Sequence, residues 1–217
     1  MAYQTIKKET EIEFTEKKST FIGSVKRVFT EEDAISFIEE IKNRHKGARH
    51  YVYAYSLGEN ENIQRYSDDG EPQGTGGIPV LETIKKNNLR NTVVVVTRYF
   101  GGILLGTGGL ARAYSRGARD AIDFAGSIDR VSGYEVDIEV KYEAHGSLEH
   151  YLRENSIDIV DIKYTDVVNI IIFVETIGFN KIYDSILDIT SGDVKIVKSD
   201  ESLFYKDKNK LLKEIEG

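Results

Sequence analysis

The run Val93-Val94-Val95-Val96 constrains the fold of this 217-residue chain more than any other segment. β-Branched residues favour extended backbone, and the four valines do not alternate with polar residues. A strand with this pattern has apolar side chains on both of its faces, which suits a central strand buried on both sides. We therefore expect residues 92–97 to form an interior strand of a sheet.

A glycine-rich turn follows this run and opens an expected helix over about residues 110–124. Glycines let the main chain approach an anion closely, and the first N–H groups of a helix can then hold that anion. Arg112, Arg116 and Arg119 follow at spacings that place them on one side of the helix. Residues 83–119 contain seven Lys or Arg and no Asp or Glu, although the formal net charge is −7. This segment predicts an anion-binding patch; an ordinary solvated face is the alternative.

The composition is typical of a globular protein that lies in the cytoplasm and not in a membrane. Hydrophobic residues make up 40% and charged residues 30%, and no apolar run approaches the roughly 18 residues that span a bilayer. The charged residues 1–12 lack the apolar core of a secretory signal, and there is no cysteine for disulfides or thiolate metal ligands. The length suits two domains.

The acidic excess belongs to the C-terminal part of the chain. Residues 1–130 contain 19 basic and 18 acidic side chains, whereas residues 131–217 contain 10 and 18. Binding of a charged partner follows the local patch within about a Debye length, roughly 8 Å at physiological salt. The N-terminal part therefore remains a candidate for binding nucleic acid.

The N-terminal part has the pattern of a mixed domain. Residues 4–13 and 19–28 are expected to be paired strands, and residues 50–55 another strand. Thr30 is an expected N-cap with acidic residues in the first helical turn. Apolar residues then recur at helical spacing until Gly47: Ala34, Ile35, Phe37, Ile38 and Ile41. Pro79 is expected in the first turn of a further helix.

Residues 126–133 are the expected domain junction, which gives an N-terminal domain of residues 1–130 and a second domain of residues 131–205. The second domain has the ferredoxin-like order of strand, helix, strand, strand, helix and strand. These elements are expected at residues 134–142, 144–155, 158–164, 167–174, 179–189 and 193–204. The charged tail, residues 206–217, is expected to fray, with Leu211, Leu212 and Ile215 as the apolar residues of a possible short helix.

A second glycine loop, residues 67–77, precedes the helix that contains Pro79. Its carboxylates, on Asp68, Asp69 and Glu71, lack the alternating ligands of a calcium loop, so side chains bonded to nearby backbone are favoured over a metal site. His50 is expected to be paired with backbone in the core or, alternatively, to face this loop. The histidines have no zinc-binding spacing, and the first glycine turn has no Walker lysine, so we expect no metal and no cofactor.

Two sets of residues are therefore candidates for binding, and none is assigned a catalytic role. The first set is Arg98, Tyr99, Phe100, Gly101, Gly102, Gly106, Thr107, Gly108, Gly109, Arg112, Arg116 and Arg119. The second set is His50, Asp68, Asp69, Glu71 and Thr75. In the first set the arginines are expected to bind phosphates and residues 106–109 to offer backbone N–H groups, with close packing as the alternative role of Gly101 and Gly102. Tyr99 or Phe100 either stacks on unpaired bases or ends the core of the strand.

Two long motifs resemble the YigZ/IMPACT family over about residues 15–125. They are Ser67-Asp68-Asp69-Gly70-Glu71-Pro72-Gln73-Gly74-Thr75-Gly76-Gly77 with Pro79-Val80-Leu81, and Val96-Thr97-Arg98-Tyr99-Phe100-Gly101-Gly102-Ile103-Leu104-Leu105-Gly106-Thr107-Gly108-Gly109-Leu110. The resemblance implies an α+β N-terminal domain with a left-handed βαβ fold, like the second domain of ribosomal protein S-five and half of the GHMP kinases. The C-terminal part resembles the domain of bacterial members that is similar to the last domain of elongation factor G.

The resemblance also implies a role around translation. Eukaryotic members restrain a starvation-activated kinase pathway through a ribosome-associated protein, and bacterial members are suspected of binding nucleic acid or ribosomes. We expect this chain to lack the additional N-terminal domain of the eukaryotic members, and therefore not to share their regulation of the kinase pathway. The function expected is therefore non-catalytic binding of RNA or a ribosomal component in translation or its regulation. The alternatives are an enzyme acting on a phosphorylated small molecule or nucleotide at the glycine-rich cleft, and a protein-interaction module.

Overall fold

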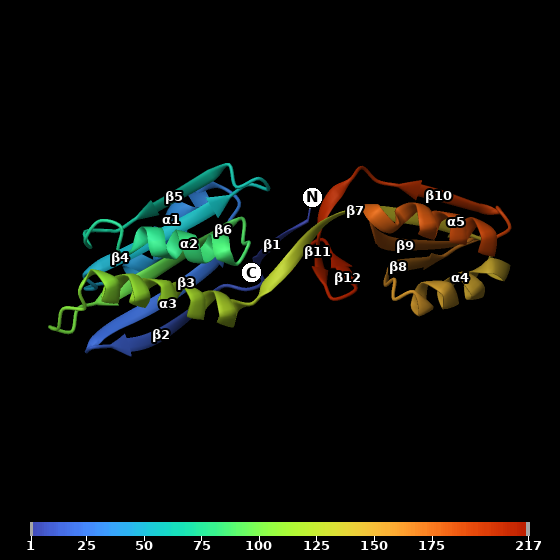
Figure 1. Ribbon diagram of the computed structural model, residues 1–217. Coiled ribbons are helices and arrows are strands. Elements are labelled where there is room, and N and C mark those ends of the chain that lie inside the picture. Colours follow the sequence, from blue (N-terminus) through green and yellow to red (C-terminus); the bar gives the residue numbers. More distant parts are fainter. Residues whose placement is uncertain (1, 216–217) are drawn as a thin grey trace. The chain divides into compact units, whose positions relative to one another are not determined.

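The computed structural model describes residues 2–215, which divide into two compact units (Figure 1). One comprises Tyr3–Ile128 and the other chiefly residues 129–215. Both combine helices with an antiparallel sheet, so the chain is an α+β protein of two domains. Within residues 2–215, no helix has the length and apolar character needed to cross a bilayer.

The N-terminal unit is built on a five-stranded antiparallel sheet in the order β2-β3-β6-β4-β5. The strands of this unit are β1 (Tyr3–Ile6), β2 (Thr10–Glu16), β3 (Ser19–Arg27), β4 (His50–Leu57), β5 (Ile63–Ser67) and β6 (Thr92–Tyr99). β6 is the middle strand, as its valines predict, and all four are fully buried. Val94 and Val96 enter one apolar cluster, whereas Val93 and Val95 enter another on the opposite face.

Three helices cover the two faces of this sheet: α1 (Glu31–Arg44), α2 (Gly77–Lys86) and α3 (Thr107–Ala125). Figure 1 shows α2 and α3 side by side over one face. α1 packs on the other face and is capped as expected, because the Thr30 hydroxyl accepts a hydrogen bond from the Asp33 N–H at 3.1 Å. Ile35 does not belong to the buried stripe, since it lies on the outer side of α1 and is 53% exposed.

The boundaries of several N-terminal elements differ from the sequence prediction. The expected single strand over residues 4–13 is divided into β1 and β2. β2 and β3 form a hairpin whose two turn residues, Lys17 and Lys18, have φ of 45° and 66°, which fits the twist of paired strands. β5 was not predicted, because this half-exposed edge strand has no strong apolar alternation. α3 begins three residues before the expected start, directly after Gly106.

In the C-terminal unit, α4 and α5 pack on a curled antiparallel sheet. The elements are β7 (Ser127–Val140), α4 (Tyr142–Glu154), β8 (Ile159–Tyr164), β9 (Val168–Glu175), the short 3-10 helix η1 (Thr176–Gly178), α5 (Phe179–Ile189), β10 (Val194–Lys198), β11 (Ser202–Asp207) and β12 (Lys210–Leu212). The strand order β10-β7-β9-β8 forms the part that α4 and α5 cover.

The end of the chain was predicted wrongly. The expected strand at residues 193–204 is two strands, because β7 is long enough to pair with β10 through residues 136–140 and with β11 through residues 129–133. The expected junction, residues 126–133, therefore lies largely within β7. Residues 206–212 neither fray nor form a helix: they complete β11 and form β12, and Leu211 is buried beside Phe204. Residues 216 and 217 lie outside the described part of the chain.

Candidate functional site

Two glycine-rich loops come together at one end of the N-terminal sheet. They are the β5–α2 loop, residues 68–76, and the β6–α3 loop, residues 100–106. With residues at the start of β4 and α3 they enclose a cleft of about 330 Å³. The lining residues are Arg49, His50, Gly70, Glu71, Pro72, Arg98, Phe100, Leu104, Leu105, Gly106, Thr107 and Leu110. The two candidate sets of residues thus meet, and the cleft has both cationic and anionic groups.

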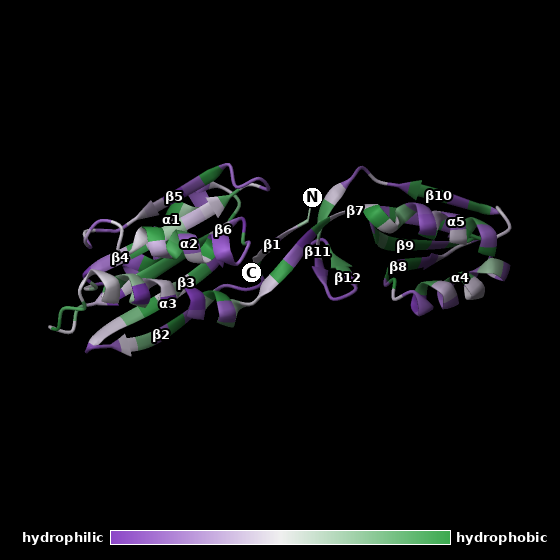
Figure 2. Ribbon diagram, viewed as in Figure 1, coloured by the Kyte–Doolittle hydropathy of each residue, from purple (hydrophilic) through white to green (hydrophobic). Residues whose placement is uncertain are grey.

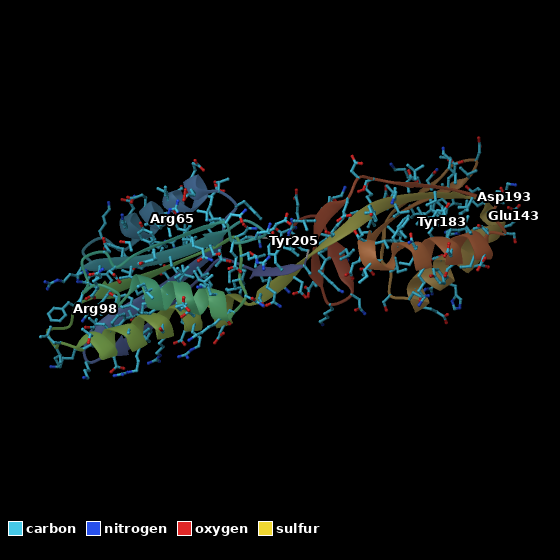
Figure 3. All side chains as sticks on the ribbon, turned by 45° about the horizontal axis from the view of Figure 1, so that its top comes forward. Arg65, Arg98, Glu143, Tyr183, Asp193 and Tyr205 are labelled. Carbon is cyan, nitrogen blue, oxygen red and sulfur yellow. The ribbon has the colours of Figure 1, made fainter. Side chains whose placement is uncertain are left out.

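A buried ion pair forms one wall of this cleft. The Arg98 Nη1 lies 2.6 Å from the Glu71 Oε1, and the two side chains are only 5% and 4% exposed. The Tyr114 hydroxyl donates to the same carboxylate oxygen at 2.7 Å, and the His50 Nε2 lies 3.8 Å from it. Burial and the nearby Glu71 charge raise the pKa of Tyr114, so its hydroxyl remains a donor. Arg98 is consequently bound within the protein. The expectation that it is an exposed phosphate ligand is not met. Figure 3 places Arg98 in the N-terminal unit, at the end where the β6–α3 loop projects.

Asp68 holds the β5–α2 loop together through its own backbone. The carboxylate accepts N–H groups of Gly74, Gly76 and Gly77 at 2.8–2.9 Å. Burial raises the pKa of this carboxyl, but the three N–H donors lower it by more, and the net pKa is below its usual value. An Asp side chain bonded to nearby backbone is the arrangement that the sequence pattern favoured here over a metal site.

We expect Asp68→Asn to lower the free energy of unfolding of the N-terminal unit by about 1–2 kcal/mol at pH 7, because hydrogen bonds to a charged acceptor are stronger than those to an amide. The folded pKa of Asp68 is depressed, so its contribution is complete above the unfolded pKa of about 3.9 and disappears as the pH falls through the folded pKa. Urea titrations of both proteins between pH 7 and pH 3 measure this. A difference in stability that stayed constant over this range would contradict the assignment.

His50 is oriented by the same loop. Its Nδ1 lies 2.8 Å from the carbonyl oxygen of Asp69, which can only accept, so the Nδ1 carries the hydrogen. The Asp69 carboxylate accepts the Tyr51 N–H at 2.6 Å, and the Thr75 hydroxyl donates to the Pro72 carbonyl at 2.6 Å. Of the second candidate set, His50 and Glu71 therefore line the cleft, whereas the other three side chains hold the loop in shape.

The aromatic residues at the end of β6 have different positions. Phe100 lines the cleft, with the guanidinium carbons of Arg49 and Arg98 each 5.4 Å from its ring centroid. Tyr99 points to the other face of the sheet, where its ring lies 6.5 Å from that of His45. Tyr99 cannot stack on a ligand in the cleft, because successive side chains of a strand face opposite ways.

The glycines of the β6–α3 loop have separate roles. A Cβ on Gly101 would lie 1.8 Å from the Lys18 carbonyl oxygen, so this glycine permits close packing on the β2–β3 hairpin. Gly102 and Gly106 have φ of 84° and 72°. A Cβ on Gly109 would meet Leu105 at 3.0 Å. Gly108 has neither a positive φ nor a close neighbour: its Cβ would have the Arg112 Nη1 at 3.6 Å as its nearest contact.

The three arginines of α3 are exposed but do not line the cleft. Arg112 and Arg116 line a second hollow of about 220 Å³ together with Lys17, and Arg119 lines a third hollow together with Lys86. Arg116 also forms an ion pair with Asp120 at 3.2 Å. The first candidate set thus separates into cleft residues and residues of the outer face of α3.

Sequence reasoning missed Arg49 and the leucines of the cleft. Arg49 lies outside both loops, and it reaches the site because its N–H donates to the Arg98 carbonyl at 2.9 Å, next to the pairing of β4 with β6. The only signal for Leu104 was its position in a glycine loop, where an apolar side chain has no nearby core to enter.

The chain matches known proteins along most of its length. It is 40% identical over 196 residues to the IMPACT family member YvyE of Bacillus subtilis, a match that covers 89% of this chain and 90% of the relative. The chain belongs to the IMPACT family. Residues 17–122 match the Impact N-terminal domain, and residues 138–193 match a domain of unknown function, DUF1949.

Two further matches cover a smaller part of the chain or have lower sequence identity. The IMPACT family member YigZ of Escherichia coli is 42% identical over 108 residues, which cover 49% of this chain and 53% of the relative. A crystal structure described as that of a hypothetical protein has a TM-score of 0.59 and 27% identity, over 90% of this chain and 96% of that chain. Both cleft loops lie within the Impact N-terminal domain.

Proposed function

We propose that this protein binds RNA through the outer face of α3 and acts without catalysis in translation or its regulation. The supporting observation is the exposed row of Arg112, Arg116 and Arg119, with the exposed Lys17 and Lys86 on either side of the same helix. Steps of four and three residues separate the arginines by about 6 and 4.5 Å along the axis, so the three can meet several phosphates of one strand. The acidic pI does not oppose this, since the patch acts locally.

We further propose fold relationships that fit a ribosomal setting in the cytoplasm. The N-terminal unit is proposed to have the left-handed βαβ topology of the second domain of ribosomal protein S-five. The C-terminal unit is proposed to be ferredoxin-like and similar to the last domain of elongation factor G. The antiparallel order β10-β7-β9-β8, with a helix in each crossover, supports the second relationship. The family resemblance supports the role around translation.

Charge reversal on α3 tests the RNA proposal. We expect Arg112→Glu/Arg116→Glu to weaken binding of a labelled single-stranded RNA at least about tenfold in fluorescence anisotropy, because repulsion replaces two phosphate contacts. The matched control is Arg153→Glu/Lys163→Glu, which makes the same change in charge at exposed positions of the C-terminal unit.

The salt dependence provides a second measurement on the same proteins. Each phosphate neutralised contributes about −0.7 to the slope of log affinity against log salt for a single strand, so the α3 variant should have a slope about 1.4 less negative than wild type. If the α3 variant and the control variant weakened RNA binding equally, the binding would depend on the net charge of the protein and not on the position of the arginines. Absence of wild-type binding to single-stranded RNA, duplex RNA and tRNA at low salt would defeat the proposal.

A further inference from the structure

The cleft between the two glycine loops is distinct from the outer face of α3, and we infer that it binds a terminal phosphate monoester attached to an apolar or aromatic body. A free mononucleotide and the phosphorylated end of an RNA strand both have this chemistry. The inference does not require that the arginine row binds RNA.

The start of α3 supplies donors for the phosphate. Gly106 is the N-cap and has no side chain to bond the first N–H groups, and no acidic residue lies in the first turn. Gly106 and Thr107 line the cleft. Gly108 needs to be glycine for neither its φ nor its packing, since the nearest atom to a Cβ there would be the Arg112 Nη1 at 3.6 Å, an ordinary contact distance. Uncapped N–H groups with unobstructed backbone are the arrangement that binds phosphate at a helix N-terminus.

The buried charges of the cleft give independent support for an anionic ligand. Arg98 lines the cleft although only 5% of its side chain is exposed. Its Nη1 donates to Glu71 and its Nη2 to the Ser19 hydroxyl, but its buried Nε has no hydrogen-bond partner among residues 2–215, so the guanidinium is satisfied only in part. Arg49, which is exposed, lines the same space. The wall therefore has two guanidinium groups and one carboxylate, and an anion balances the excess cation.

The apolar residues of the cleft fit the body of the ligand. Pro72, Phe100, Leu104, Leu105 and Leu110 form an apolar surface, and Leu104 is 83% exposed. Figure 2 shows the hydrophobic part of the β6–α3 loop, which contains Leu104, at the end of the N-terminal unit. The volume of about 330 Å³ is near the lower end of the roughly 300–1,000 Å³ of small-molecule sites. One nucleotide-sized body fills such a cleft and covers the exposed leucine.

Calorimetric titration of the full chain with adenosine 5′-monophosphate, adenosine and inorganic phosphate tests the site. We expect the monophosphate to bind at least about tenfold more tightly than either of the other two, because only it engages both the phosphate-binding groups and the apolar residues of the cleft. Arg49→Gln should weaken this binding about tenfold, since it removes a charge-assisted contact. Lys46→Gln is the matched control, because Lys46 is exposed on the same segment but does not line the cleft.

A second arm distinguishes the two sources of the phosphate. Single-stranded RNA of ten nucleotides is compared with 5′-phosphate, 3′-phosphate or hydroxyl ends by anisotropy. A preference of about fivefold or more for a phosphorylated end, abolished by Arg49→Gln, assigns the site to an RNA end. Binding of the monophosphate with no such preference assigns it to a free metabolite. In either case the amide signals of Thr107 and Gly108 should shift in the NMR spectrum of wild type.

The inference is overturned if the protein discriminates neither the monophosphate from adenosine nor phosphorylated from hydroxyl RNA ends. Binding that leaves the Thr107 and Gly108 signals unchanged overturns it as well. The failure of the proposed RNA function is a separate result: monophosphate binding without any RNA binding leaves the cleft inference standing. Conversely, RNA binding that depends on Arg112 and Arg116 but not on end phosphates removes only the cleft inference.

Discussion

Glu71→Ala should destabilise the N-terminal unit by about 3–5 kcal/mol, which is the range for breaking a buried ion pair. The substitution leaves the Arg98 guanidinium buried without its carboxylate, and it removes the acceptor of the Tyr114 hydroxyl. It also frees the β5–α2 loop from β6 and α3. Native-state hydrogen exchange of the β6 amides measures the effect in this unit without requiring the two units to unfold together.

Three companion variants make the Glu71 prediction specific. Glu71→Gln should lower the stability less than Glu71→Ala does, because an amide oxygen can still accept the hydrogen bond from Tyr114. Glu71→Met/Arg98→Met should also lower the stability less than Glu71→Ala does, since it removes both charges together and approximately keeps the volume of the two side chains. Glu82→Ala removes only an exposed ion pair with Lys85 and should change stability by at most about 0.5 kcal/mol. A loss of under about 1 kcal/mol for Glu71→Ala would show that water replaces the carboxylate.

Gly23→Ala is expected to cost about 3 kcal/mol or more, the upper end of overpacking effects. A Cβ on Gly23 would lie 2.1 Å from the Gly117 carbonyl oxygen and 3.2 Å from the Ala121 Cβ. The oxygen belongs to the backbone of α3, so relief requires the helix to move away from β3. Because α3 also positions Tyr114 and the first turn at the cleft, this change should weaken ligand binding as well as stability.

Urea unfolding and hydrogen exchange of α3 amides test the Gly23 prediction. Gly146→Ala is the control: Gly146 is within helix α4 and has no positive φ, and a Cβ there would have open space around it within the described part of the chain. Alanine at this position should stabilise the C-terminal unit by about 0.5–1 kcal/mol, because it lowers the entropy of the unfolded chain. A Gly23→Ala protein as stable as wild type would mean that α3 and β3 are less closely packed than the structure has them.

The two proposed surfaces share one helix and use different parts of it. The outer face of α3 presents long, exposed cations, which suit a phosphate backbone. Its first turn presents N–H groups to a cleft with an apolar side, which suits one small group. Arg112 is near both, so a variant at this position alone does not separate them. Arg116 and Arg49 do, because each contributes to one surface only.

Local patterns were sufficient to predict much of the architecture. Four consecutive valines predicted the middle strand, and Thr30 with the acidic residues that follow it predicted the start of α1. In the C-terminal unit, the apolar periodicity of each segment predicted the order of strands and helices from β7 to β10. The glycine loops were recognised as candidate sites. Each of these features depends on residues close together in the chain, where backbone preference and side-chain periodicity are directly visible.

Long-range pairing decided what the local patterns did not. Residues 206–212 are charged and were expected to fray, yet they join the sheet. β11 pairs with β7, and residues 205–207 of β11 pair in turn with residues 210–212 of β12. Arg98 was expected to face a ligand as a free cation, but Glu71, 27 positions earlier in the chain, binds it in the interior. Tyr99 or Phe100 was expected to stack on bases, but strand alternation places Tyr99 on the other face of the sheet, beside His45. Local sequence patterns identified the two glycine loops and their charged residues as candidates. The folded structure shows which of these residues satisfy one another and which remain open to a ligand, because burial and charge pairing depend on contacts between distant segments.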